Sequence, residues 1–219
     1  MASPPPTHTA VAPSTPTRSR GADTAERILD AAEACFAGRG YAGTTLRDVA
    51  ERVGIRIPSL YNHFPNKESL YGAVLERGMR PILELLTRFV AAGEASYRDP
   101  GEITAQVMEL LGQRPNLPRL IQYELLAGGE HLAPLLEDWL RPTIAGGLAL
   151  LENTGADSRW RPDQLPLLLL AFVNIAIGHF TTAPLFEGLE GESPLSQNAL
   201  ARQTEFFGQL TASLVGPEP

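Results

Sequence analysis

The sequence predicts an all-α protein with a small helix-turn-helix head followed by a larger helical body. Apolar residues recur at helical spacing almost without a break from residue 23 onward. Stretches that alternate apolar and polar residues, as half-buried strands do, do not occur at any useful length. Clusters of Gly, Pro, Asn and Asp separate the helical segments. We therefore divide the chain into a Pro-rich tail at 1–22, a head at 23–80 and a body at 81–219.

The tail is expected to be disordered. It contains five prolines among Ser, Thr and Ala and has no aromatic residue, so it cannot bury enough surface to offset the entropy of ordering it. Arg18 and Arg20 at its end are either idle tail charges, the interpretation we favour, or minor-groove contacts.

The first two helices of the head are marked by capping signals. Asp23 and Glu26 have capping-box spacing at the start of a helix that should end at residues 38–40. Thr44 is expected to cap a second helix, and Gly54 is expected to end it.

A short third helix is predicted over 57–64, followed by a long fourth helix to about residue 92. Asn66 is expected to cap the fourth helix, and Pro81 should kink it because proline lacks an N–H and crowds the carbonyl of Arg77. This helix belongs to both head and body, so we expect motion in the body to swing the head about the kink. The remaining helices are expected at 102–113, 117–127, 132–153, 162–186 and 195–214.

Charge is distributed as expected for a protein that docks one end on phosphate groups. The formal net charge of −7 argues against non-specific coating of nucleic acid. Residues 1–78 carry 9 basic and 8 acidic side chains, whereas residues 79–219 carry 9 and 17. The start lacks an apolar secretory signal, and the apolar run at 165–177 is expected to be too short to span a bilayer. A cytoplasmic protein without membrane contact is predicted.

The stretch TTLRDVAERVGIRIPSLYNHF at 44–64 has the features of a helix-turn-helix. Ala50 is small where the two helices cross, Gly54 allows the turn, and Leu60 faces inward. The second helix then exposes an unusual polar and aromatic set, namely Arg56, Ile57, Ser59, Tyr61, Asn62 and His63. A short helix has little structural reason to expose such residues unless something docks there.

From about residue 23 to 76 the sequence resembles the TetR family of bacterial regulators. The resemblance rests on RILDAAEACFAGRGY, TTLRDVAERVGI, PSLYNHF and NKESL. It implies a dimeric transcriptional repressor that binds a palindromic operator in double-stranded DNA and is released by a small ligand. The body shows no such fingerprint and resembles the family only in the number and placement of its helices.

The resemblance assigns the DNA contacts. Base-reading positions are Arg47, Arg56, Ile57, Pro58, Ser59 and Asn62, and phosphate-contacting positions are Thr45, Tyr61, His63 and Lys67. Arg suits guanine and Asn suits adenine, while Lys67 lies at a helix N-terminus that favours an anion.

Several of these assignments have a plainer alternative. Arg47 and His63 are otherwise ordinary surface residues, and Tyr61 is otherwise a core aromatic. Ile57 either touches a thymine methyl group or simply packs. Arg56 also departs from the family pattern, since a small polar cap is more usual there.

The last two helices are expected to form a homodimer. The run at 165–177 is apolar on nearly every side. In the last helix a coiled-coil-like seam steps by three and four residues through Leu200, Gln203, Phe207, Leu210 and Leu214. Packing within one chain is the alternative.

The middle helices are expected to enclose a small apolar or aromatic effector. The polar candidates for orienting it are Tyr123, Glu124, Asn174 and His179, although His179 suits the dimer interface better.

The sequence disfavours two other classes of function. An enzyme is disfavoured because the four histidines lack metal-ligand spacing and no GxSxG, P-loop or GxGxxG motif occurs, so no catalytic, metal or cofactor site is predicted. Cys35 is the one cysteine and suits a core position. A helical adaptor acting on proteins is disfavoured by the outward Arg47, Tyr61 and Lys67.

Overall fold

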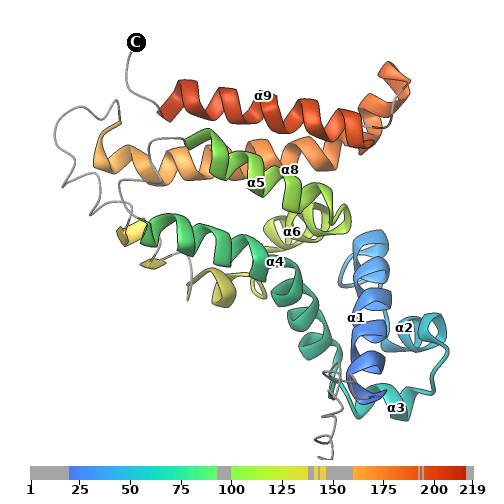
Figure 1. Ribbon diagram of the computed structural model, residues 1–219. Helices are drawn as coiled ribbons and strands as arrows, with labels where there is room; N and C mark the ends of the chain where they lie inside the picture. The colour runs from blue at the N-terminus through green and yellow to red at the C-terminus, as the bar shows by residue number, and fades with distance from the viewer. Residues whose placement is uncertain are drawn as a thin grey trace, which may run out of the picture.

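The computed structural model describes residues 20–92, 100–137, 141–142, 144–146, 160–191, 193 and 195–215, and every regular element in these ranges is a helix. Figure 1 shows the elements in chain order, which are α1 (Arg20–Arg39), α2 (Leu46–Val53), α3 (Ile57–Tyr61), α4 (Lys67–Ala91), α5 (Pro100–Gly112), α6 (Asn116–Ala127), the 3₁₀ turn η2 (Pro162–Gln164), α8 (Leu165–Glu190) and α9 (Gln197–Val215). The all-α prediction is confirmed.

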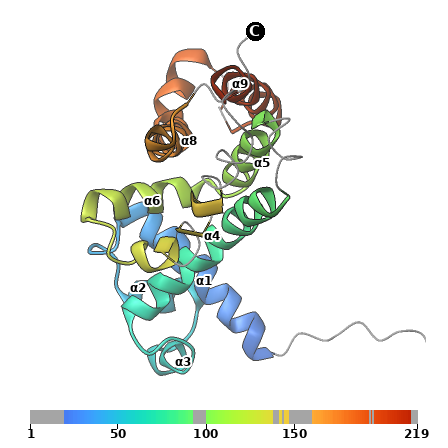
Figure 2. The same cartoon turned by 90° about the vertical axis from the view of Figure 1, so that its left-hand side faces the viewer.

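The head consists of α1, α2, α3 and the first half of α4, packed around one apolar cluster. Phe36, Leu60, Leu70 and Tyr71 are fully buried in this cluster, and Leu120 of α6 joins them from the body. Figures 1 and 2 show α2 and α3 on the outer side of α1, away from the body.

Two predicted caps are wrong. Helix α1 begins at Arg20, so residues 20–22 are helical rather than part of a disordered tail, and Asp23 lies within the first turn. Residues 1–19, including Arg18, lie outside the described ones. The N-cap of α2 is Thr45 rather than Thr44. Thr44 is fully buried, and its hydroxyl donates to the carbonyls of Cys35 and Gly40 at 3.0 Å each.

Helix α4 connects the head to the body and contains Pro81 in its interior. Asn66 caps it in a reciprocal box with Ser69. Figure 1 shows the segment beside α1 and the segment beneath α5 running in different directions. The Arg77 carbonyl, four residues before Pro81, accepts a hydrogen bond from the Arg114 guanidinium at 3.1 Å. A group from the body therefore satisfies the carbonyl that proline leaves without an intrahelical donor.

The body centres on α5 lying against α9, with α6 and α8 beside them. Small residues allow the close approach of α5 and α9, since a Cβ on Gly208 would lie 3.3 Å from the Gly101 carbonyl oxygen. Thr211 donates to Thr104 across the same contact at 2.9 Å. A second apolar cluster includes Met108, Leu111, Leu117, Ile177 and Phe180.

The body helices follow the predicted order with shifted ends. Helix α8 runs through Pro184 to Glu190, and α9 begins two residues later than expected. Of the predicted helix over 132–153, residues 133–137, 141–142 and 144–146 are helical, Leu132 lies in a turn, and the rest lies outside the described residues.

The length of α8 corrects one argument made from the sequence. Its stretch Pro166–Leu185 is 20 residues long and apolar enough to cross a membrane by length and composition, and 17% of it is buried. Such a helix is weak evidence for a membrane span, because helices that pack against protein pass the same test. The expected apolar run at 165–177 is part of this longer stretch, so its length does not argue against a membrane span.

Candidate nucleic-acid interface

The turn between α2 and α3 sets the direction of the recognition helix. Gly54 adopts a left-handed φ of 77°, and its N–H together with that of Ile55 bonds to the Ala50 carbonyl at 3.0 Å. Leu60 is fully buried and anchors α3 to the head core. Arg27 of α1 donates to the Val53 carbonyl at 2.8 Å and holds the end of α2. Local backbone requirements thus fix the angle between the two helices.

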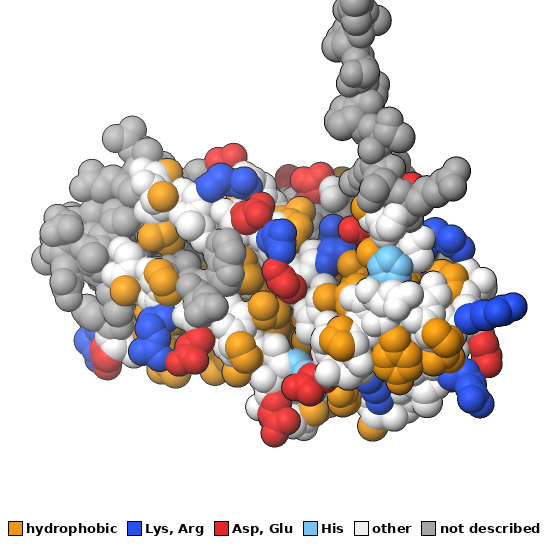
Figure 3. All heavy atoms as spheres, turned by 90° about the horizontal axis from the view of Figure 1, so that it is seen from below, with side chains coloured by type: hydrophobic (Ala, Val, Ile, Leu, Met, Phe, Trp, Pro, Cys, Tyr) orange, Lys and Arg blue, Asp and Glu red, His pale blue; other side chains and the backbone are white. Residues whose placement is uncertain are grey.

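Most of the sequence-predicted DNA contacts lie together on the outer surface of the head. Arg47, Arg56, Pro58, Tyr61 and Asn62 are exposed with Thr45, whereas Ile57, Ser59, His63 and Lys67 are half-buried. Figure 3 looks at this underside and shows Lys and Arg side chains projecting around the rim of the head. Helix α3 ends at Tyr61 rather than Phe64, although the N–H of Phe64 still bonds to the Leu60 carbonyl at 3.0 Å.

The start of α3 departs from a typical capped helix. Arg56 occupies the N-cap position and makes no capping hydrogen bond, and Pro58 follows in the first turn. Ile57 packs against the head core, which favours packing over a thymine contact. Arg56 therefore leaves the helix end uncapped while its guanidinium stays exposed.

Replacing Arg56 by Ser is expected to stabilise the head and weaken DNA binding. A serine N-cap should raise the free energy of unfolding by about 0.5–1 kcal/mol, while loss of the guanidinium should weaken binding of a cognate duplex by about 1–3 kcal/mol. Thermal unfolding and fluorescence anisotropy measure the two changes on one sample. Unchanged DNA affinity in a stabilised variant would remove Arg56 from the interface.

The start of α2 is held by Thr45 and Asp48. The Thr45 hydroxyl accepts from the Asp48 N–H at 3.2 Å, and the Asp48 carboxylate accepts from the Thr45 N–H at 2.8 Å and from its hydroxyl at 2.7 Å. Hydrogen bonds from the Thr45 side chain and backbone, with the Arg39 charge at 3.4 Å, lower the pKa of Asp48. Thr45 is thus both a cap and an exposed candidate for phosphate contact.

Lys67 begins α4, where free N–H groups and the helix dipole favour an anion. Its ammonium group lies 4.3 Å from the centre of the Tyr41 ring. The sequence reasoning did not select Tyr41, although an aromatic residue within a glycine-containing turn was a usable signal.

The contact between α1 and α4 centres on Arg77. Its guanidinium bonds to Asp30 and Glu33 at 2.7 Å and to Glu26 at 3.2 Å. Asn116 at the start of α6 donates to the other Glu33 oxygen at 3.5 Å. Burial tends to lower the pKa of Arg77, but the hydrogen bonds to Asp30 and Glu33 outweigh burial and leave it raised. One arginine thus ties the head to the helix that enters the body.

Two of the four ligand candidates lie between head and body. The Tyr123 ring packs against the turn after α1. It lies so near Gly40 that a Cβ at that position would be 3.9 Å from the ring. Glu124 is buried and accepts from the backbone N–H of His131 at 3.1 Å, and its carboxylate also faces the His131 Nδ1 at 3.2 Å.

The other two candidates lie on α8, where they make separate contacts. The Asn174 amide donates to the Leu170 carbonyl of its own helix at 2.8 Å. The His179 ring packs edge-on against Phe180 and Phe207, and its Nε2 is buried without a hydrogen-bond partner in the described structure. A role for these four residues in ligand binding stays a prediction.

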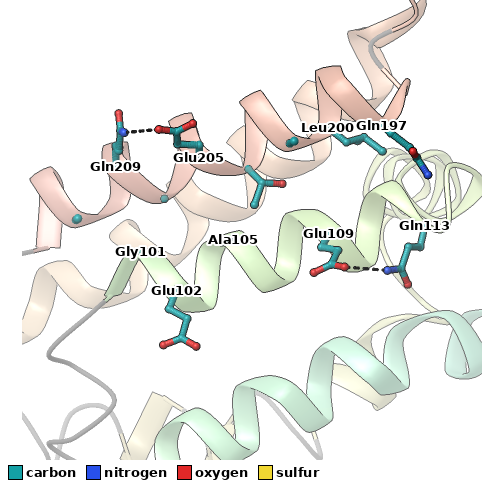
Figure 4. A pocket seen from close by; sticks show the side chains of 13 residues that line it. Gly101, Glu102, Ala105, Glu109, Gln113, Gln197, Leu200, Glu205 and Gln209 are labelled. Atoms are coloured by element: carbon teal, nitrogen blue, oxygen red, sulfur yellow. Dashed lines mark hydrogen bonds between the residues drawn. The ribbon is translucent and has the colours of Figure 1, made fainter.

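The body carries an open groove of about 880 Å³ between α5 and α9. Figure 4 shows Glu102, Glu109 and Glu205 along it, with Glu109 accepting from Gln113 at 3.3 Å and Glu205 from Gln209 at 3.2 Å. None of the four ligand candidates lines this groove. Its carboxylates also suit an apolar effector poorly.

Known proteins are similar to this chain both in the head and over most of its length. The family model described as bacterial regulatory proteins, tetR family, matches residues 28–74. The HTH-type transcriptional regulator RutR of Escherichia coli K12 is 34% identical over 197 residues, which cover 88% of this chain and 87% of RutR. The HTH-type transcriptional repressor KstR2 of Mycobacterium tuberculosis H37Rv is 39% identical over 84 residues, 38% of this chain and 36% of KstR2.

A solved structure from the same family shares the fold of this chain. A tetR-family regulatory protein from Rhodococcus RHA1 superposes with a TM-score of 0.67 at 23% identity, covering 92% of this chain and 100% of its own. The match to the family model, the likeness to RutR over 88% of the chain and the shared fold agree with the helix-turn-helix geometry. The chain belongs to the TetR family of bacterial transcriptional regulators, which are DNA-binding proteins rather than enzymes.

Proposed function

We propose that this regulator is a repressor that binds a palindromic operator as a homodimer and is released by a small effector. DNA binding is supported by the outward face of α2 and α3. On this face Arg47, Arg56 and Asn62 are exposed, while Leu60 is buried and anchors α3. With Lys67 at the start of α4, the head presents groups suited to base edges and to phosphates on one surface.

Leu200 and Phe207 of the seam expected on α9 pack within the chain against the second apolar cluster. The dimer half rests instead on other apolar side chains that the single chain leaves uncovered. Leu167 and Leu170 of α8 are 65% and 57% exposed, and Phe206 of α9 is 59% exposed. A second copy packing α8 and α9 against its own would bury this face, as a lipid bilayer also would. A partner copy is favoured because relatives of the chain are DNA-binding regulators. Two-fold symmetry would set the recognition helices about 34 Å apart or a multiple of this, which requires a palindromic site.

Replacing Leu170 by Asp is expected to convert the protein to a monomer and weaken operator binding. Burying a charge in place of an apolar side chain costs about 2 kcal/mol or more per protomer, so the dimer dissociation constant should rise about a thousandfold. Sedimentation without detergent measures the oligomer, and anisotropy at several salt concentrations measures operator binding, whose affinity should fall steeply as salt rises.

Leu126 of α6 provides the matched control, since it is 76% exposed but lies outside the last two helices. Leu126→Asp should leave both the dimer and DNA binding unchanged. A wild-type protein that sediments as a monomer and still binds its operator tightly would contradict the proposed dimer.

The proposal that a small effector binds this protein is supported by its membership of the TetR family and by its helical body. We propose a small apolar or aromatic effector held among the middle helices, with His179 placed at the dimer interface rather than on the ligand. We also propose a cytoplasmic location, and a boundary between head and body near residue 80, where α4 turns. A thermal-shift screen of small aromatic and polar molecules tests the effector class, because the effector should raise the unfolding temperature and release operator.

A further inference from the structure

The Tyr41 ring lies between a DNA-contact candidate and the body. Lys67 approaches Tyr41 with its ammonium 4.3 Å from the ring centre. The Tyr41 ring also contacts the Tyr71 ring and the His131 imidazole, with centroids 4.8 Å apart in both pairs. Tyr41 therefore touches the first residue of α4 and a residue of the body.

His131 is itself held by a buried carboxylate. Glu124 is 2% exposed and contacts both the backbone N–H and the ring Nδ1 of His131. The imidazole also meets Tyr71 edge-on at 5.0 Å. Tyr71 is fully buried, and burial together with the Glu124 charge raises the pKa of its hydroxyl. The imidazole is thus fixed by contacts with α4, with α6 and with the turn after α1.

We propose that Glu124 and His131 of the body position Lys67 for DNA by holding Tyr41 against its ammonium group. This inference rests on the proposed function, because it takes Lys67 to be a phosphate contact. A lysine side chain has four rotatable bonds and loses entropy when it is ordered. An aromatic face that attracts its ammonium restricts it before DNA arrives. The body then influences DNA affinity through the turn after α1 as well as through the kink in α4.

The Glu68 carboxylate is the other charge acting on Tyr41, and with Glu124 it raises the pKa of Tyr41, which burial raises most. Glu68 is exposed and adjacent to Lys67 in sequence, but neighbouring residues of a helix do not face each other, so the Tyr41 ring rather than Glu68 restrains the ammonium group. Loss of the Tyr41 ring or of its support should therefore let Lys67 turn away from the DNA face.

A double-mutant cycle on the full-length dimer tests this inference. The probe is a fluorescent duplex selected from random sequence with the wild-type protein, and its affinity is measured from low to high salt. Lys67→Ala should lower affinity and flatten the dependence of log K on log salt by about 0.9 per lost phosphate contact. Tyr41→Leu and His131→Leu should each weaken binding about two- to fivefold per half-site with a flattened slope.

Conservative variants and a background mutation separate positioning from folding. Tyr41→Phe keeps the ring and should restore most of the affinity and slope, whereas His131→Phe keeps the ring but loses the Nδ1 contact with Glu124 and should restore only part of them. In the Lys67→Ala background, Tyr41→Leu and His131→Leu should cost almost nothing further. Arg119→Ala removes an exposed cation on α6 and should leave the slope unchanged. If His131→Leu unfolds, His131→Gln also lacks the ring and takes its place in the cycle.

Two results would overturn the inference in distinguishable ways. Equal losses from Tyr41→Leu and His131→Leu with and without Lys67 would show that these rings act only on stability, while Lys67 remains a DNA contact. An unchanged affinity and slope for Lys67→Ala would remove Lys67 from the interface, and with it both the inference and that part of the proposed function.

Discussion

Arg77→Met is expected to be among the most destabilising substitutions of a charged residue in this chain. The guanidinium is 19% exposed and joins three carboxylates, of which Glu33 is itself 17% exposed. Removing it leaves Glu33 partly buried without its cation, and because Glu26 and Asp30 are well solvated we expect a loss of about 2–3 kcal/mol rather than more. Chemical denaturation monitored by circular dichroism measures the change.

Arg80→Met is the matched control for this substitution. Arg80 lies three residues further along α4 and pairs with Glu76 at the surface, where both side chains are at least half exposed. Such a pair contributes at most about 1 kcal/mol. Equal destabilisation by the two variants would show that the Arg77 cluster does not hold the head to α4.

Pro81→Ala is expected to change the coupling between effector and operator more than either affinity alone. The new N–H at position 81 would compete with Arg114 for the Arg77 carbonyl, so α4 should straighten and lose its tie to the body. If the kink transmits motion to the head, the coupling factor should depart from the wild-type value, which typically lies at about 5–150-fold. Titrating the effector found by thermal shift, with and without operator, measures this factor in both directions.

Pro184→Ala supplies a control that also removes a proline from a helix interior, but in α8. It should leave the coupling factor unchanged. If Pro81→Ala also leaves it unchanged, Pro81 is only a structural kink and the head is not driven through α4.

Helix positions were predictable because they depend on short-range periodicity, whereas helix ends depend on contacts that the pattern does not contain. The apolar spacing placed each described helix within a few residues of its observed range. Thr44 and Thr45 are equally good caps by composition, and only burial of Thr44 beneath Cys35 and Gly40 decides between them. Likewise, α8 continues past its predicted end at residue 186 to Glu190, although its apolar pattern fades there.

The site was predictable to the extent that it is local. The helix-turn-helix lies within a 21-residue stretch, so its turn, anchor and outward face follow from one motif. The Arg77 cluster joins residues 44 to 51 positions apart, and the His131 contacts join Tyr41 to a residue 90 positions away. Neither has a sequence signal. Tyr123 and Glu124 were predicted to orient the effector because they are polar groups on an apolar helix, but the structure places them against the head.

Selection of binding sequences from random duplexes, with wild type and Arg47→Ala in parallel, tests the central claim most directly. The account predicts that the wild type enriches one inverted repeat. Arg47→Ala should bind it about 1–3 kcal/mol more weakly and lose base preference at one position in each half-site. Lys67→Ala should weaken all sequences similarly. If the wild type enriches no inverted repeat, or if both variants scale affinity without changing preference, the α2–α3 face does not read the operator as described here.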